Sequence, residues 1–303
     1  MIWIIGDVDG KKYKEPFSKG ILSRSLNVAD IGYERAYDMA SDIEKDLIKN
    51  NICEIASYDL ADVVLNHLKK VDPKMAQKYE NWRSLRKSEK PLIILIGGAS
   101  GVGTSSMACE LANRLRLKNI ISTDMIREVM RKIVSKELSP VIHKSSFDAY
   151  ESIRTPSVSV DPVIEGFISH VDVVNVGIEA IIERSVKEGI STIIEGVHIV
   201  PGFIRKDLMD NNNIIIFTLT VDDEESHKQR FYSRCRQPWV KRPLERYMDN
   251  FETIRRTQQF LVEQAKINDA RIINNVEINE TIDIMISDIL EKFGGENDVE
   301  QES

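Results

Sequence analysis

Cysteine and histidine are scarce in this sequence, and neither is spaced for a disulfide framework or a metal site. The three cysteines, Cys53, Cys109 and Cys235, lie far apart and form no CxxC pair. The five histidines contain no HxxxH or HExxH spacing, which argues against a zinc site. An odd number of separated cysteines is typical of reduced thiols. We therefore expect a cytoplasmic protein.

Long apolar runs and an excess of positive charge are also missing. The N-terminal stretch MIWII is followed at once by polar residues, so it is too short for a signal peptide or a membrane span. The formal net charge of -7 argues against a protein that coats nucleic acid. We expect neither a membrane nor a nucleic acid as a partner. The length of 303 residues allows about two domains.

The chain changes character at the charged stretch RSLRKSEK, residues 83–90. Before it, a short β-prone run and a turn are followed by several helical patterns. These predict a small, mainly helical domain over residues 1–88. After it, Leu92 to Ile96 is a continuous apolar run, which is typical of a strand buried on both faces of a parallel sheet.

From this run onward, strand-like and helix-like segments alternate, which predicts an α/β domain with a doubly wound parallel sheet over residues 89–293. The acidic residues 294–303 are expected to form a disordered tail. Further strands are expected at Asn119–Ser122, Ser191–Ile194, Ile214–Leu219 and Arg271–Ile273.

The strongest chemical signal follows the apolar run, in the sequence GGASGVGTSS. Read from Gly98, it matches the spacing GxxxxG-x-[ST] of a phosphate-binding loop, or P-loop. Glycines let the backbone amides curl around a polyphosphate, and the following helix N-terminus adds partial positive charge. Ser105 stands where the hydroxyl ligand of Mg²⁺ belongs. We therefore predict that ATP and Mg²⁺ bind here, with contacts from Gly98, Ser100, Gly101, Val102, Gly103, Thr104, Ser105 and Ser106.

One residue departs from the P-loop pattern, because Thr104 occupies the position where such a loop carries lysine. A threonine hydroxyl donates one hydrogen bond but brings no charge to the β- and γ-phosphates. Stabilisation of the transferring phosphoryl group must then come from other residues, or catalysis is lost. The alternative is a glycine-rich turn that binds no ligand.

Carboxylates follow two of the expected strands. Asp124 stands at the carboxyl end of one strand, where ligands bind in open α/β sheets. It can accept the proton of a substrate hydroxyl or hold Mg²⁺ through water; the alternative is an ordinary helix N-cap. Glu195 ends another buried strand and can orient the water shell of the metal.

The segment from Lys228 to Arg246 concentrates positive charge in an otherwise acidic chain. Arg230 and Arg234 are four residues apart, so they share a helix face and can bind phosphate oxygens together. The prolines in this segment favour a lid that closes over the site. The alternative is a solvated helix paired with Glu224 and Glu225.

With these residues placed, the sequence resembles the archaeal 2-phosphoglycerate kinases. The resemblance rests on LIGGASGVGTSS, STDMIREVMR, IIEGVHIVPG and RFYSRCR, and it covers most of the chain. It implies a P-loop kinase fold, Mg-ATP as the donor, and formation of 2,3-bisphosphoglycerate, a precursor of cyclic 2,3-diphosphoglycerate. The acceptor is then a small phosphorylated acid. The resemblance assigns Arg127 and Arg131 to the acceptor, and Arg230, Arg234 and Arg236 to the phosphates.

Two alternatives stay open beside this reading. In the first, the chain is a kinase of another small phosphorylated or acidic metabolite. In the second, it is a nucleotide-binding regulator that does not transfer phosphate, because Thr104 replaces the P-loop lysine. A homo-oligomer is compatible with each of them.

The N-terminal segment separately resembles an ATP-cone, a small nucleotide-sensing domain. The resemblance is carried by Asp9-Gly10, the turn Glu15-Pro16-Phe17-Ser18 and the helix around Leu22 to Leu26. ATP-cones usually have a basic pair before the Asp-Gly turn, whereas Asp7-Val8 stands there in this chain. If this domain binds a nucleotide, its expected contacts are Lys11, Lys12 and Lys19.

Overall fold

In the part of the chain that it describes, the computed structural model has two compact units, residues 1–88 with 286–293, and residues 89–285. Some predicted features lie outside the described residues: the Asp9-Gly10 turn, Arg236 with the rest of 236–242, and the tail 294–303. None of the described helices is long and apolar enough to cross a membrane. The structure describes residues 2–8, 11–26, 31–87, 90–153, 155, 159–210, 213–235 and 243–293.

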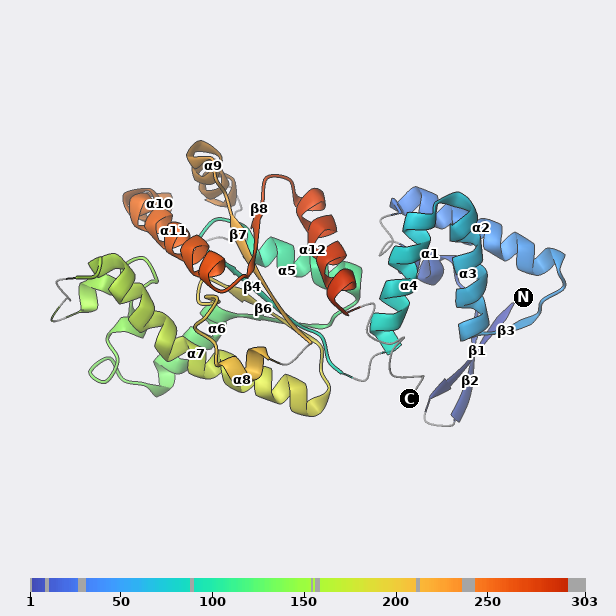
Figure 1. Ribbon diagram of the computed structural model, residues 1–303, viewed down its shortest axis with the longest axis horizontal. Helices are drawn as coiled ribbons and strands as arrows, with labels where there is room; N and C mark the ends of the chain where they lie inside the picture. The colour runs from blue at the N-terminus through green and yellow to red at the C-terminus, as the bar shows by residue number, and fades with distance from the viewer. Residues whose placement is uncertain are drawn as a thin grey trace. The chain divides into compact units, whose positions relative to one another are not determined.

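The N-terminal unit combines a small sheet with helices (Figure 1). Strand β1 (Trp3–Val8) pairs antiparallel with β2 (Lys11–Pro16) and parallel with β3 (Glu54–Ala56), in the order β2-β1-β3. The short strand β3 was not expected, because three residues are too few to show an alternating pattern. The helices are α1 (Lys19–Leu26), α2 (Tyr33–Lys49), α3 (Ser57–Val71) and α4 (Pro73–Lys87).

The second unit is built on a parallel sheet with the strand order β5-β6-β4-β7-β8. Each neighbouring pair in this sheet is parallel, so the predicted doubly wound sheet is confirmed. The four residues Ile93 to Ile96 are fully buried, as expected for a strand covered on both faces. The strands are β4 (Ile93–Gly98), β5 (Asn119–Ser122), β6 (Thr192–Gly196), β7 (Ile214–Thr220) and β8 (Arg271–Asn274).

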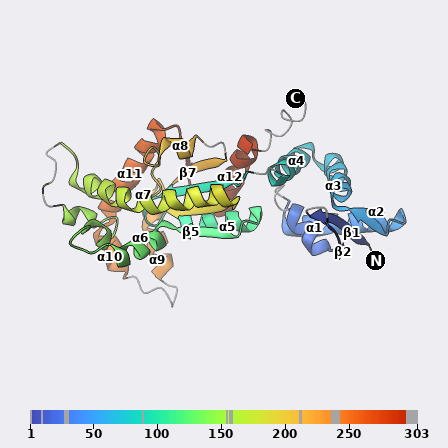
Figure 2. The same ribbon diagram turned by 90° about the horizontal axis from the view of Figure 1, so that it is seen from below.

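Helices cover both faces of this sheet. The long helix α7 (Pro162–Glu188) packs Val174, Ile178 and Ile182 against Ile93 and Leu95 of β4, and Figure 2 shows it lying across the sheet. Helix α5 (Thr104–Leu115) lies on the opposite face (Figure 1). The remaining helices are α6 (Thr123–Ile133), η2 (Val141–His143), η3 (Ala149–Ser152), α8 (Lys206–Met209), α9 (Glu224–Cys235), α10 (Leu244–Asp249), α11 (Phe251–Ile267) and α12 (Ile278–Phe293).

The strand register brings the chemically important segments to one edge of the sheet. Ile96 of β4 pairs with Glu195 of β6, and Glu195 pairs with Ser122 of β5. The P-loop after β4, the start of α6 and the end of β6 are therefore neighbours. From β4 the chain continues to β5 on one side of β4, while β7 lies on the other side of β4. Such a switch in strand order opens a crevice where ligands bind.

Candidate active site

The P-loop leaves β4 at Gly98 and enters α5 at Thr104. Gly101 and Gly103 have φ angles of 90° and 98°, a left-handed backbone that glycine adopts without steric cost. The carbonyl oxygen of Gly103 accepts a hydrogen bond from the Met107 amide at 3.0 Å, so the loop runs directly into the helix. This strand–loop–helix arrangement is the one that the glycine spacing predicts.

Carbonyl groups of the loop are bound from the side of α9 and the residue that follows β8. The His227 ring donates from Nε2 to the Ser100 oxygen at 2.8 Å. The Val102 oxygen accepts two hydrogen bonds, from Arg230 Nη1 at 2.8 Å and from Asn275 Nδ2 at 2.7 Å. Two carbonyls of the loop are therefore fixed in direction.

This fixed direction decides where the loop amides point. In a trans peptide the C=O and N–H groups point to opposite sides, and the described chain has no cis peptide. Because the carbonyls of Ser100 and Val102 point toward α9, the amides of Gly101 and Gly103 point away from it. Converging amides at a helix N-terminus form the cradle that a polyphosphate needs.

Asn275 is held firmly enough to act as a brace for the loop. It is only 1% exposed, and its backbone amide donates to the Thr220 oxygen at 2.9 Å. Its Oδ1 accepts from the Thr281 hydroxyl at 3.1 Å, and Arg230 Nη2 donates to its carbonyl. Burial lowers the pKa of the Arg230 guanidinium. Arg230 and Asn275 thus form one hydrogen-bonded group behind the P-loop.

Thr104, at the position of the usual lysine, points its hydroxyl at a carboxylate. Its Oγ1 donates to Glu195 Oε2 at 2.7 Å, and Glu195 is 4% exposed. Ser105 and Ser106, the next two residues of α5, are exposed. The register of β4 and β6 therefore places a buried carboxylate against the first turn of α5, beside the serine that was expected to bind Mg²⁺.

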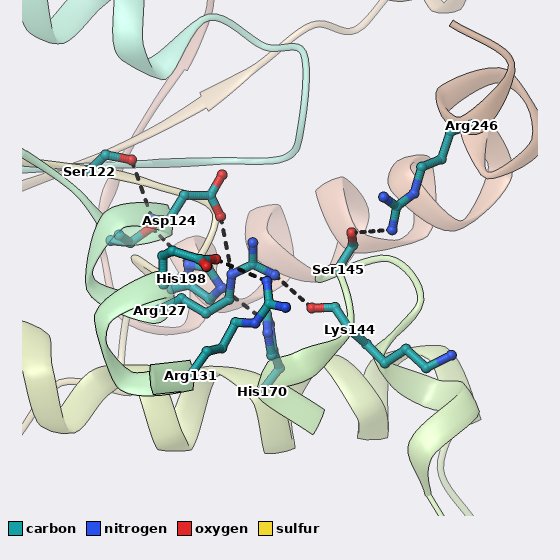
Figure 3. Close-up of polar contacts among 11 residues, drawn as sticks. Ser122, Asp124, Arg127, Arg131, Lys144, Ser145, His170, His198 and Arg246 are labelled. Carbon is teal, nitrogen blue, oxygen red and sulfur yellow. Dashed lines mark hydrogen bonds and ion pairs between the residues drawn. The ribbon is translucent and has the colours of Figure 1, made fainter. Parts of the chain in front are cut away.

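A pocket of about 200 Å³ lies beside the loop. Its lining includes Ser100 of the loop, Asp124 and Arg127 of α6, and Arg246 of α10. Figure 3 shows the side chains of Asp124, Arg127 and Arg246. Arg127 donates from Nη1 to the Lys144 oxygen at 2.6 Å, and its Nε lies 3.7 Å from Asp124 Oδ1. Two guanidinium groups at one small pocket suit an anionic ligand.

Arg246 is absent from the set of functional residues chosen from the sequence. Its Nη2 donates to Asp148 Oδ2 at 2.8 Å and to Ser145 Oγ at 2.7 Å, as Figure 3 shows for Ser145. Ser145 also lines the pocket. These partners lie about a hundred residues earlier in the chain, so no local spacing connects them. The only signal in the sequence was the cationic segment in which Arg246 stands.

The chain has close relatives among named proteins. It is 53% identical over 304 residues to a protein named 2-phosphoglycerate kinase from Methanothermobacter thermautotrophicus, with 99% of each chain covered. The chain belongs to the 2-phosphoglycerate kinase family. A protein of the same name from Methanopyrus kandleri is 46% identical, with 94% of this chain and 87% of that protein covered. The resemblance inferred from the motifs is thereby confirmed.

Two further comparisons concern parts of the chain. Residues 8–88 match a family model described as the ATP cone domain, which confirms the resemblance of the N-terminal segment. Among solved structures, shikimate kinase from Acinetobacter baumannii is similar over 69% of this chain and 95% of its own, with 14% identity and a TM-score of 0.39.

In this member of the 2-phosphoglycerate kinase family, two further predicted site residues, Asp124 and Arg131, lie on α6. Ser122 caps the helix by accepting from the Asp124 amide at 3.3 Å, so Asp124 is not the N-cap. Arg131 lies one turn beyond Arg127, and its Nη1 donates to Glu128 Oε2 at 2.9 Å. Asp124 is thus left with its carboxylate in the pocket.

The two arginines predicted to share a face of α9 differ in their surroundings. The guanidinium of Arg230 is hydrogen-bonded to the carbonyls of Val102 and Asn275, whereas Arg234 is exposed. Glu224 lies 3.8 Å from Arg255, and Glu225 accepts from Gln229 at 3.1 Å. The helix is therefore not simply a solvated one, because its inner face holds the P-loop.

A chain of buried hydrogen bonds joins the start of α6, the segment after β6 and helix α7. His198 Nδ1 lies 2.8 Å from Thr123 Oγ1, and its Nε2 lies 3.2 Å from His170 Nδ1. All three side chains are fully buried. Gly196 has a φ of 138°, and a Cβ atom there would collide with the Thr123 hydroxyl. These contacts fasten the first residue of α6, and hence the position of Asp124, to the end of β6.

The two histidines make the stability of the family member depend on pH. Burial lowers the pKa of His170 to about 2 and of His198 to about 3, from 6.5. Both therefore stay neutral in the folded chain, while the unfolded chain takes up protons below about pH 6.5. Stability is complete above that pH and falls toward pH 3, by up to about 1.4 kcal/mol per pH unit for each histidine.

We expect His170→Gln to flatten this dependence, because glutamine does not titrate. The free energy of unfolding in urea, measured at several pH values between neutral and mildly acidic, should fall less steeply for the variant than for the wild type. Its value at neutral pH should be lower, since the buried bond to His198 is altered. Equal slopes for the two proteins would show that His170 is already charged or accessible in the folded state.

Proposed function

We propose that this chain transfers the γ-phosphoryl group of ATP to the 3-hydroxyl group of 2-phosphoglycerate, which yields 2,3-bisphosphoglycerate and ADP. The observation that carries the proposal is the 53% identity over 99% of the chain with a relative named 2-phosphoglycerate kinase. The pocket beside the P-loop supports it, because two arginines line a cavity of about 200 Å³. Such a pocket matches a small acceptor that carries both a phosphate and a carboxylate.

The P-loop fits the donor nucleotide and its metal. The amides of Gly101 and Gly103 point to the side opposite α9, and the loop ends at the N-terminus of α5. The exposed hydroxyl of Ser105 is assigned to Mg²⁺, and Glu195 to the waters around the metal. When bound, ATP supplies the phosphoryl group, and Mg²⁺ neutralises part of the negative charge on its phosphates. Contacts with the nucleotide are assigned to Gly98, Ser100, Gly101, Val102, Gly103, Thr104, Ser105 and Ser106.

The pocket residues take the acceptor side of the reaction. Arg127 and Arg246 hold the phosphate and carboxylate of the acceptor, since guanidinium groups bind both in a forked geometry. Asp124 accepts the proton of the reacting hydroxyl, because its carboxylate lines the same pocket as Ser100 of the P-loop. Arg131 stays a second candidate for the acceptor, one helical turn away.

Positive charge that a P-loop lysine would supply comes from arginines in this proposal. Arg127 is held at the pocket by its bond to the Lys144 carbonyl. Arg234, exposed on α9, is retained as the group that binds the phosphoryl group in transfer. Arg230 acts on the P-loop instead, and Arg236 lies outside the described residues.

ADP release tests the proposal directly. Purified protein with ATP and Mg²⁺ should release ADP when 2-phosphoglycerate is added, and should not do so with 3-phosphoglycerate. A panel of other phosphorylated acids extends the test to the alternative acceptors. ATP binding without turnover on any acceptor would refute the proposal and favour a nucleotide-binding regulator.

A further inference from the structure

Four buried rings form a continuous row between the P-loop and the pocket assigned to the acceptor. The ring of His227 stacks on Phe231, with centroids 5.4 Å apart and planes inclined by 21°. Phe231 stacks in turn on Tyr247, at 4.8 Å and 20°. Tyr247 lies 5.9 Å from Phe147, with the planes inclined by 58°. His227 and Phe231 are fully buried and the other two rings nearly so. We call these four residues the ring row.

One end of the ring row is joined to the P-loop. His227 donates from Nε2 to the Ser100 carbonyl at 2.8 Å. A Cβ atom on Gly101 would lie only 2.5 Å from the Phe231 ring and 3.0 Å from the His227 ring, so the loop backbone runs directly against both. A movement of the loop toward α9 therefore has to displace both rings.

The other end of the row belongs to the wall of the pocket. Phe147 and Tyr247 line it together with Arg246. The guanidinium carbon of Arg246 lies 5.5 Å from the centroid of the Phe147 ring, a distance at which the face of a ring attracts a cation. Arg246 also donates to Asp148 and Ser145, and Figure 3 shows the bond to Ser145. The position of this guanidinium thus depends on the last ring of the row.

Phe231 is the ring that connects the two ends. It does not belong to the described lining of the pocket, and a phenyl ring brings neither charge nor a hydrogen bond to a ligand. Phe251 packs edge-on against His227 at 5.4 Å and against Phe231 at 6.5 Å, which supports the row from the side. Because protein interiors are close-packed, stacked rings move together rather than separately. A displacement at one end of the row is therefore passed to the other end through Phe231.

We propose that Phe231 is a positioning residue for phosphoryl transfer, which couples the P-loop to Arg246 through the ring row. The inference rests on the proposed function, because it needs a nucleotide at the P-loop and a phosphorylated acid in the pocket. A ligand at either site orders its end of the row, so the second ligand meets a site that is already ordered and binds more tightly. Phe231 acts through His227 and Tyr247 rather than by contact with either ligand.

Calorimetric titration of the full chain with the β,γ-imido analogue of ATP and Mg²⁺ tests the proposal, because the analogue binds without transfer. In the wild type, saturating 2-phosphoglycerate should tighten analogue binding at least about fivefold. Phe231→Leu keeps an apolar side chain but removes the flat face on which both neighbours stack. In this variant, the affinities measured with and without 2-phosphoglycerate should agree within about twofold.

The kinetics of ADP release give a second measurement. Phe231→Leu should lower kcat by about ten- to a hundredfold, because small errors in the position of the reacting groups are costly, and should change KM for either substrate less than kcat. Tyr232→Leu is the matched control, since Tyr232 is the next residue of α9 and its ring is 42% exposed. The control should keep the wild-type coupling between the two ligands.

A second variant keeps the test decisive if Phe231→Leu fails to fold. In His227→Gln, glutamine keeps an N–H donor for the Ser100 carbonyl but has no ring to stack on Phe231, so the coupling should again be lost. The proposal is overturned if 2-phosphoglycerate leaves the wild-type affinity for the analogue unchanged, or if either variant folds and retains the wild-type coupling. A lower melting temperature with full coupling would show a purely structural role. If the wild type releases ADP with 2-phosphoglycerate but shows no coupling, the positioning role falls and the proposed function stands; without ADP release, the proposed function falls as well.

Discussion

Asp124→Asn should lower kcat for phosphoryl transfer by about 10²- to 10⁴-fold, which is the usual contribution of a general base. The carboxylate lines the pocket together with Ser100 of the P-loop and is 48% exposed, with its Oδ1 3.7 Å from Arg127 Nε. Asparagine keeps the shape and the polar contacts but cannot accept the hydroxyl proton. KM for 2-phosphoglycerate should therefore change much less than kcat. Steady-state ADP release at saturating ATP is the measurement.

Glu128→Gln is the matched control for this variant. Glu128 lies on the same helix one turn further along, and its partner is Arg131 rather than the pocket. The substitution removes one negative charge from α6 and should leave kcat within about twofold of the wild type, as expected for an exposed ion pair. If Asp124→Asn retained most of its activity, Asp124 would be only a partner of Arg127, and another base would have to be sought.

Arg230→Ala should reduce kcat/KM for ATP by about ten- to a hundredfold and should also lower the melting temperature. The guanidinium bonds the Val102 carbonyl at 2.8 Å and the Asn275 carbonyl. Loss of charge-assisted hydrogen bonds to buried groups costs about 1.5–3 kcal/mol, which corresponds to this range of rates. Because the Val102 carbonyl would keep only its bond from Asn275, the direction of the Gly103 amide would be held less firmly.

Gln229→Ala serves as the control, since Gln229 is exposed on the same helix and its side chain donates to Glu225 rather than to the P-loop. It should leave both nucleotide affinity and melting temperature unchanged. A different result for Arg230→Ala would revise its role. If kcat fell while ATP affinity and stability stayed at wild-type values, Arg230 would bind the phosphoryl group in transfer, as the sequence first indicated.

Regular elements with a strong pattern were predictable from the sequence. The buried strand that begins at Ile93, and the alternation of five strands with helices along the second unit, followed from alternating apolar and helical segments. Strand β3 was missed, because Glu54–Ala56 is too short for a pattern and becomes a strand by pairing with β1. The order of strands in the sheet was also beyond the sequence, since it depends on which distant segments pair.

The candidate site was likewise predictable where it depends on local sequence and not where it depends on contacts between distant segments. The spacing of glycines and the strand before them located the P-loop, because both are local properties. The position of Arg230 behind the loop was not predictable, since helical spacing fixes which residues share a face but not what that face contacts. Arg246 and Ser145 come together from positions far apart in the chain. Thr104 was expected to contact the nucleotide, and in the structure its hydroxyl donates to Glu195.

Replacement of the loop lysine by Thr104 has a consequence for chemical labelling. A nucleotide analogue that carries an acyl phosphate or a sulfonyl fluoride reacts with an amine, which a P-loop lysine would supply. A hydroxyl that donates to Glu195 at 2.7 Å is a weak nucleophile toward such reagents. A proteome-wide survey by these probes would therefore pass over this loop even when ATP occupies it, and absence from such a survey would carry no information about its activity.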